Sequence, residues 1–210
     1  MQSFTDRYQA GRLLAEALAH YRGATDAVVV ALPRGGVPVA AEVAAALGVP
    51  LDVLVVRKLG APGHSELAVG AIASGGARVI NEELVRQLGL DAATLDRIAE
   101  RETGELHRRE ALYRGRRPAL EVAGRTVVLV DDGVATGATM LAAVSALREL
   151  GAKRLVVAVP VGAPDSLARL REAADEVVCL LAPIQLASVG QWYDDFSQTG
   201  DAEVRSLLNG

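Results

Sequence analysis

The sequence predicts an α/β protein built on a doubly wound, mainly parallel sheet, with a helical insertion and a small C-terminal hood. Three observations lead to this fold class. Five short runs rich in Val and Leu show little polar alternation, as strands do when both faces of a sheet are covered. Helical patterns separate most of these runs. Half of the 210 residues are hydrophobic, which suits one domain over residues 1–210.

The expected elements follow in order along the chain. An initial helix is expected over residues 7–21, where one apolar face is formed by Leu13, Leu14, Ala17 and Leu18. The expected strands are the apolar runs 27–32, 52–57, 126–131, 154–161 and 176–181. The expected connecting helices are 37–47, 139–150 and 165–173, and glycines suited to C-terminal caps follow the first two, Gly48 and Gly151.

Two segments interrupt this alternation. The first, from about 82 to 117, contains 8 acidic and 8 basic residues, and apolar residues repeat among them at helical spacing: Leu95, Ile98, Ala99, Leu106 and Tyr113. We expect a helical insertion that either covers the sheet or forms an arm for a partner or a second copy. The second segment is the hood, about 182–210, which holds Trp192, Tyr193 and Phe196 among the seven aromatic residues of the chain.

The composition excludes several classes of function. The formal net charge of −4 argues against non-specific binding of nucleic acid, which usually requires a basic surplus. The single Cys excludes an internal disulfide and a cysteine-based zinc site. No apolar run reaches about 18 residues, so we expect no membrane-spanning helix. The N-terminal residues lack the apolar core of a signal peptide, so we expect a cytoplasmic protein.

The strongest chemical signal is the segment 126–140. An apolar run leads into Asp131 and Asp132, then into a loop of small and hydroxyl residues, then into a helix. Free amides at a helix N-terminus favour a phosphate, and Gly133 and Gly137 permit close approach. The neighbouring carboxylates suit sugar hydroxyls or a hydrated Mg²⁺. The pattern predicts a site for a ribose 5-phosphate; a turn with two helix-capping acids is the simpler alternative.

Residues 127–139 resemble the 13-residue signature of type I phosphoribosyltransferases, which use phosphoribosyl diphosphate (PRPP). The strand, the acid pair and the loop 136–139 match it without gaps. Gly133 departs from the family, which usually has an aliphatic residue there. Ala135 matches adenine transferases and replaces the Asp of hypoxanthine-guanine transferases, which weakens that assignment without establishing adenine. The whole chain resembles a bacterial group of phosphoribosyltransferase-domain proteins that share its Pro-Arg-Gly-Gly and Val-Arg-Lys segments.

The resemblance implies a Mg²⁺-dependent transfer of the 5-phosphoribosyl group from PRPP to a nitrogen acceptor, a nucleobase in nucleotide salvage, with release of pyrophosphate. It implies catalytic roles for Asp131, Asp132 and Lys58, with the two acids holding the metal through water. The 5-phosphate would lie on the loop of Gly133, Val134, Ala135, Thr136, Gly137, Ala138 and Thr139. The pyrophosphate would lie on Arg34, Gly35, Gly36, Arg57 and Lys58. The family often has a non-proline cis peptide in the first of these loops, here at Arg34 or a neighbour.

Three further expectations complete the hypothesis. A mobile loop over 59–67 is expected to close over the sugar, and its His64 or Glu66 is either an acid–base group or a solvated loop residue. Trp192 and Tyr193 either stack on the acceptor or form a small core of the tail. The partners implied are PRPP, a small-molecule acceptor and a second copy in a homodimer, with neither nucleic acid nor membrane. A PRPP or nucleotide sensor without turnover, and a phosphoribosyl-binding partner that docks through the insertion, are the alternatives.

Overall fold

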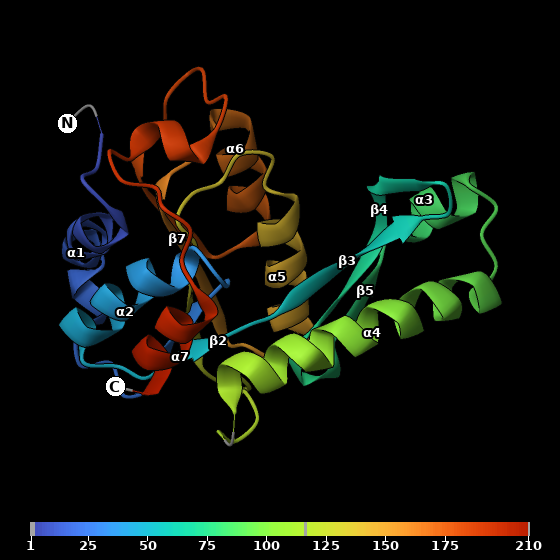
Figure 1. Cartoon of the computed structure of the whole chain (residues 1–210), viewed down its shortest axis with the longest axis horizontal. Coiled ribbons are helices and arrows are strands. Elements are labelled where there is room, and N and C mark those ends of the chain that lie inside the picture. Colours follow the sequence, from blue (N-terminus) through green and yellow to red (C-terminus); the bar gives the residue numbers. More distant parts are fainter. Residues whose placement is uncertain (1–2, 116, 210) are drawn as a thin grey trace.

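The computed structural model describes residues 3–115 and 117–209, apart from the side chains of Ser65 and Glu66. Its body is a five-stranded parallel sheet in the order β2-β1-β6-β7-β8 (Figure 1). The strands are β1 (Ala27–Ala31), β2 (Leu51–Val53), β6 (Thr126–Val130), β7 (Arg154–Val161) and β8 (Glu176–Leu181). The fold class is therefore the predicted one, and β7 and β8 have the predicted bounds.

Helices cover both faces of this sheet, which explains why its strands are apolar without alternation. One face packs against α1 (Arg7–Ala17), α2 (Gly36–Leu47) and α7 (Asp201–Asn209). The other face packs against α5 (Ala138–Glu149) and α6 (Pro164–Ala173). The expected first helix is shorter than predicted, because α1 ends at Ala17 and a 3₁₀ turn, η1 (Ala19–Tyr21), follows. In the described part of the chain, no helix combines the length and the apolar character needed to cross a membrane.

The predicted strand 52–57 is wrong, because the chain changes sheets within it. Leu54 still donates to Ala31 of β1, but Val55 exchanges hydrogen bonds with Ser74 instead. From there β3 (Val56–Ala61), β4 (His64–Ala73) and β5 (Arg78–Ile80) form an antiparallel sheet. Leu54 and Val55 are both buried. A continuous apolar run therefore hides the point at which hydrogen-bond partners change.

The expected loop over 59–67 is also wrong as secondary structure, because β3 and β4 pair there as a hairpin. Pro62 and Gly63 form its turn, and Gly63 has a φ of +76°. The strands contain many small residues, which have low strand propensity. One of these, Gly70, is required because a Cβ there would collide with the carbonyl oxygen of Val79 in β5. Tertiary packing thus overrides the local preference.

The predicted insertion is helical and consists of α3 (Glu82–Gln87) and α4 (Ala92–Arg114). The five apolar residues named above are all buried along α4. The arm formed by β3–β5, α3 and α4 projects from the body, and the C-terminal end of α4 returns to α7 (Figure 1). The expected cover on the main sheet is wrong, because α4 packs on β3 and β4 of the arm's own sheet. The alternative, an arm for a partner or a second copy, stays a prediction.

Two arginines attach the returning end of α4 to the body. Arg114 is 8% exposed, pairs with the Asp52 carboxylate of β2 and donates to the carbonyl oxygen of Pro118. Arg117 donates to the carbonyl oxygens of Leu51 and Leu208, at 2.9 and 2.8 Å. The position of the C-terminal part of α4 is therefore set by buried polar contacts with the body.

We expect Arg114→Ala to lower the free energy of unfolding by about 3 kcal/mol, because it removes a buried guanidinium and leaves the partly buried Asp52 carboxylate without its cationic partner. Urea unfolding followed by circular dichroism would measure the change. Arg97→Ala, on the exposed side of the same helix, should change stability by less than about 0.5 kcal/mol. Equal stability of Arg114→Ala and the wild type would show that the pair does not hold the arm.

Candidate active site

The acid pair lies at the carboxyl end of β6, beside the loop that follows β1. Because β1 and β6 are adjacent and parallel, both chain ends reach the same edge of the sheet. A Cβ at position 35 would collide with Oδ2 of Asp132. A Cβ at position 36 would lie 2.8 Å from the carbonyl oxygen of Val130 and 3.1 Å from Oδ1 of Asp131. Only glycines at these two positions let the loop pack directly on the acids.

The loop 33–36 after β1 is the expected pyrophosphate loop, and such a role is favoured by backbone amides that are free to meet an anion. The peptide bond between Pro33 and Arg34 is cis, as the resemblance implied. The amide of Gly36, however, donates to the carbonyl oxygen of Leu32 at 3.1 Å, as the chain turns into α2. The Gly36 amide is therefore not available to an anion, and the paired glycines are explained by close packing on the acids.

The loop 133–139 forms a cavity of about 200 Å³ on the β7 side of the acid pair, away from β1, because Val134 bridges to Gly162 at the end of β7. Gly137, with a φ of +76°, precedes α5, and no side chain caps the first amides of that helix within the described residues. Two carbonyl groups of the loop face α6, because Ser166 Oγ donates to Ala135 at 2.7 Å and Arg169 Nη2 donates to Thr136 at 2.6 Å. The uncapped helix N-terminus, held from behind by α6, suits a phosphate.

The hood explains why a glycine is required at position 133. A Cβ at this position would lie 2.5 Å from Cγ1 of Val189 and 2.9 Å from Cγ1 of Val161. Val189 begins the 3₁₀ turn η3 (Val189–Trp192) of the hood and also lines the loop cavity. Its side chain therefore fills the space that an aliphatic residue at position 133 would take.

Arg7 of α1 is a residue of this site that sequence reasoning missed. Its Nε donates to Oδ2 of Asp132 at 2.8 Å, and its Nη1 donates to the carbonyl oxygen of Ser197 at 2.8 Å. The guanidinium lies over the Phe196 ring, 3.8 Å from its centroid, and Arg7 is 9% exposed. Because 125 residues separate Arg7 from Asp132, no local pattern could have identified this pair.

Burial raises the pKa of both acids of the pair. For Asp131 the neighbouring Asp132 charge raises the pKa further. For Asp132 the hydrogen bond from Arg7 opposes the effect of burial. Oδ1 of Asp131 also accepts a hydrogen bond from the Asp132 amide at 2.8 Å. The fold therefore holds two partly buried carboxyl groups side by side, an arrangement that a bound cation or polar ligand would stabilise.

The donor set is compatible with Mg²⁺ but would supply only part of its coordination. The described residues contain no group of three or more His, Cys, Asp or Glu side chains arranged to hold a metal. Mg²⁺ usually binds proteins through one or two carboxylates and takes its other ligands from water and substrate phosphates. Asp131 and Asp132 fit that requirement.

The hood aromatics lie close to the acid pair but differ in exposure. Tyr193 is 6% exposed, its hydroxyl donates to the carbonyl oxygen of Asp132 at 2.6 Å, and burial raises its pKa. Its ring packs against Phe4 and Phe196, with centroids 5.4 and 5.1 Å apart. This arrangement is the small core of the tail that was one of the two interpretations. Trp192 is partly buried, and its Nε1 has no hydrogen-bond partner among the described residues.

The basic residues of β3 lie in the arm. Arg57 donates through Nε and Nη2 to Oε2 of Glu102 in α4, at 3.0 and 2.6 Å. Lys58 is exposed and pairs with Ala71 of β4. His64 is exposed at the start of β4, and the side chain of Glu66 lies outside the described residues. The ion pair with Glu102 means that the Arg57 charge is already compensated.

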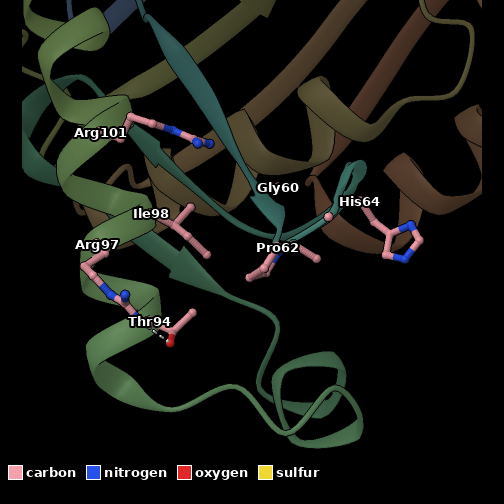
Figure 2. Close-up of a pocket in the computed structure, with 9 residues that line it drawn as sticks. Gly60, Pro62, His64, Thr94, Arg97, Ile98 and Arg101 are labelled. Carbon is pink, nitrogen blue, oxygen red and sulfur yellow. Dashed lines mark hydrogen bonds between the residues drawn. The ribbon is translucent and has the colours of Figure 1, made fainter.

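The arm also contains a cavity of about 530 Å³, between the hairpin turn and α4. Figure 2 shows Arg97, Ile98 and Arg101 of α4 on one side and Gly60 and Pro62 on the other, with the His64 ring pointing away from α4. The residues that line this cavity include neither acid of the pair nor any residue of the phosphate loop. We therefore assign the candidate active site to the edge of the main sheet.

Known proteins resemble this chain over most or all of its length. The family model for the phosphoribosyl transferase domain matches residues 5–195. A protein of Mycobacterium tuberculosis (strain H37Rv) that carries the provisional name phosphoribosyl transferase is 51% identical over 209 residues, which cover all of this chain and 47% of the relative. This chain thus spans about half the length of that relative.

Two solved structures resemble this chain in fold. The crystal structure of the TT1426 protein from Thermus thermophilus is 49% identical in sequence, with a TM-score of 0.89 over 98% of this chain and 97% of that chain. The structure of the AQ2163 protein from Aquifex aeolicus is 15% identical, with a TM-score of 0.52 over 96% of this chain and 85% of that chain. The second likeness concerns the fold alone.

We expect Asp131→Asn to raise stability at neutral pH. Asn keeps the acceptor for the Asp132 amide but removes a charge that burial and Asp132 both disfavour. Because the pKa of Asp131 is raised in the folded state, the wild type loses stability as pH rises from the ordinary Asp value through the folded value. The stability advantage of the variant over the wild type should therefore shrink on acidification. Urea unfolding midpoints of both proteins, at neutral pH and at acidic pH, would measure this change. A variant less stable than the wild type at neutral pH would contradict the assigned cause.

Proposed function

Because this chain belongs to the phosphoribosyl transferase domain family, we propose that it transfers the 5-phosphoribosyl group of PRPP to a nitrogen acceptor, a nucleobase, and releases pyrophosphate. The observation that carries the proposal is the placement of two partly buried carboxyl groups between the cavity of the loop 133–139 and the loop 33–36 after β1. Such an arrangement can hold a sugar at its diol with a phosphate on either side.

The loop 133–139 would bind the 5-phosphate. Its amides at the start of α5 meet the anion together with the positive end of the helix dipole, and the exposed Thr136 and Thr139 add hydroxyl donors. The hydrogen bonds from Ser166 and Arg169 hold the loop carbonyl groups on the far side. The phosphate would therefore meet donors in a loop that two hydrogen bonds from α6 already hold in place.

Asp131 and Asp132 would accept hydrogen bonds from the 2- and 3-hydroxyls of the ribose. Arg7 already donates to one oxygen of Asp132, and this bond orients the carboxyl group before the sugar arrives. In the transfer, the bond between the anomeric carbon and the diphosphate oxygen breaks, and its electron pair leaves with pyrophosphate. The acceptor nitrogen gives its lone pair to the same carbon and then loses its proton to solvent. The two carboxylates would stabilise the positive charge that develops on the sugar.

Mg²⁺ would be held by Asp131 and Asp132 through water, and when bound it would neutralise charge on the diphosphate. Arg34, on the opposite side of the acid pair from the phosphate loop, would contact the leaving group directly. We also keep Lys58 and Arg57 as predicted contacts of the leaving group. Both side chains would have to reach the diphosphate from the arm. The hood remains our proposed place for the acceptor, with Trp192 as its partly buried aromatic residue.

We expect the double variant Asp131→Asn and Asp132→Asn to lower PRPP turnover by at least about 100-fold, because both acids act on the sugar as charge develops. Pyrophosphate release with PRPP, Mg²⁺ and a panel of purines, pyrimidines and other amines would measure turnover. Glu121→Gln, an exposed carboxylate before the opposite end of β6, is the matched control and should keep wild-type turnover. Circular dichroism would establish that all variants are folded.

The outcomes of this experiment separate the alternatives. Wild-type turnover in the double variant would reject the mechanism. Binding of PRPP by the wild type, with no pyrophosphate released for any acceptor, would favour a sensor. Release of pyrophosphate without an acceptor would indicate hydrolysis of PRPP.

A further inference from the structure

A second polar cavity, of about 250 Å³, lies where the arm returns to the body. It is lined by Pro33 and Arg34 after β1, by Arg108, Arg109 and Tyr113 of α4, and by Asp201 of α7. Two segments that are distant in the sequence, the loop after β1 and α4, therefore bring three guanidinium groups to one cavity, and α7 adds a carboxylate. No local pattern in the insertion distinguishes Arg108 and Arg109 from its other arginines.

Two carboxylates partly compensate these charges. Arg34 Nη1 lies 3.6 Å from Oδ1 of Asp201, and the Tyr113 hydroxyl donates to the same oxygen at 3.1 Å. Glu105, one helical turn before the arginines, accepts hydrogen bonds from Arg108 and Arg109. Three arginines against two acids leave a positive cavity, which is suited to an anion.

Donors remain available on all three arginines. The hydrogen bonds of Arg108 within the described structure use Nε and Nη2, and that of Arg109 uses Nε alone. Arg109 therefore keeps both terminal nitrogens for a ligand, and Arg34 contacts Asp201 only at 3.6 Å. The side chains of Arg34 and Arg109 are 37% and 38% exposed, so an anion can reach them from solvent.

Arg34, which lines this cavity, is next in the chain to residues that pack on the acids of the candidate active site. Arg34 is followed by Gly35 and Gly36, which pack on Asp132 and Asp131. The phosphate loop lies on the other side of the acid pair, after β6. A ligand with a sugar over the acids and anionic groups at both ends would therefore extend from the loop 133–139 to Arg34.

The helix that supplies Arg108 and Arg109 is held in place near them. Arg114, less than two turns further along α4, is buried against Asp52 and Pro118, and Arg117 is tied to Leu51 and Leu208. The two cavity arginines thus lie on the anchored end of the arm. Arg97 and Arg101, which line the cavity near the hairpin turn (Figure 2), lie two to three turns away on the same helix.

We infer that Arg108 and Arg109 act with Arg34 as the binding site for the diphosphate group of the donor, and that the Asp201 carboxylate occupies this site when the diphosphate is absent. This inference rests on the proposed function for the identity of the ligand. It assigns the insertion a direct part in binding the leaving group. The charge of Arg57, by contrast, is compensated by Glu102.

Isothermal titration of the full chain with inorganic pyrophosphate, in the presence of Mg²⁺, tests the inference. The variant Arg108→Ala with Arg109→Ala should bind pyrophosphate at least about tenfold more weakly, because each lost guanidinium removes a charge-assisted hydrogen bond. The matched control, Arg97→Ala with Arg101→Ala on the same helix, should bind as the wild type does. Asp201→Asn should bind about two- to fivefold more tightly, because a competing carboxylate is removed.

Titration with ribose 5-phosphate shows whether the rest of the site is intact and should give the same affinity in every variant. Unchanged pyrophosphate affinity in the Arg108–Arg109 variant, or no binding of pyrophosphate to the wild type at millimolar concentration, would overturn the inference. If the arginine variant loses pyrophosphate binding but the wild type has no PRPP turnover, the anion site stands and the proposed function fails. If turnover is present and the arginine variant keeps its pyrophosphate affinity, only the inference fails.

Discussion

The close packing of the loop after β1 on the two acids after β6 is the constraint on which the candidate site depends. β1 and β6 are adjacent in the parallel sheet, so both loops leave the sheet at one edge. Because any side chain at position 35 or 36 would collide with the acids or with the end of β6, this contact requires two glycines. It brings Arg34 to one side of the acid pair while the phosphate loop lies on the other side.

The close packing of this loop helps to bury the two acids, and burial disfavours their charged forms. Residues distant in the sequence offset part of that cost. Arg7 donates to Asp132, and the Tyr193 hydroxyl donates to the Asp132 backbone. Arg7 also donates to Ser197, so it joins α1 and the hood to the acid pair. The pKa of both acids is nevertheless raised, chiefly by burial, so these contacts offset only part of the cost of burying the pair.

The arm illustrates how an insertion can belong both to the scaffold and to a site. Its apolar seam along α4 covers the β3–β5 sheet, while the returning end of the helix is fixed to the body by Arg114 and Arg117. Arg108 and Arg109 precede these anchors and line the cavity beside Arg34. Charged residues on the solvent side of a covering helix can therefore lie beside a loop of the main sheet, which is not the sheet that the helix covers.

The local sequence was enough to predict four of the five strands of the main sheet, the helices that connect them and the acid–loop segment, because these depend on local apolar runs and on glycines close to the acids. It did not reveal the change of sheet at Val55, where burial continues without a break while the hydrogen-bond partners change. Nor did it reveal the hairpin over 56–73, which is built from small residues with weak strand preference.

Which distant side chains meet at the site depends on the fold as a whole. Arg7 on Asp132, Val189 against Gly133, and Arg108 beside Arg34 are contacts between segments far apart in the chain. Sequence periodicity reports which face of an element is buried, but it carries no information on what that face packs against. Those partners follow from strand order and from the path of the arm, and both are properties of the whole fold.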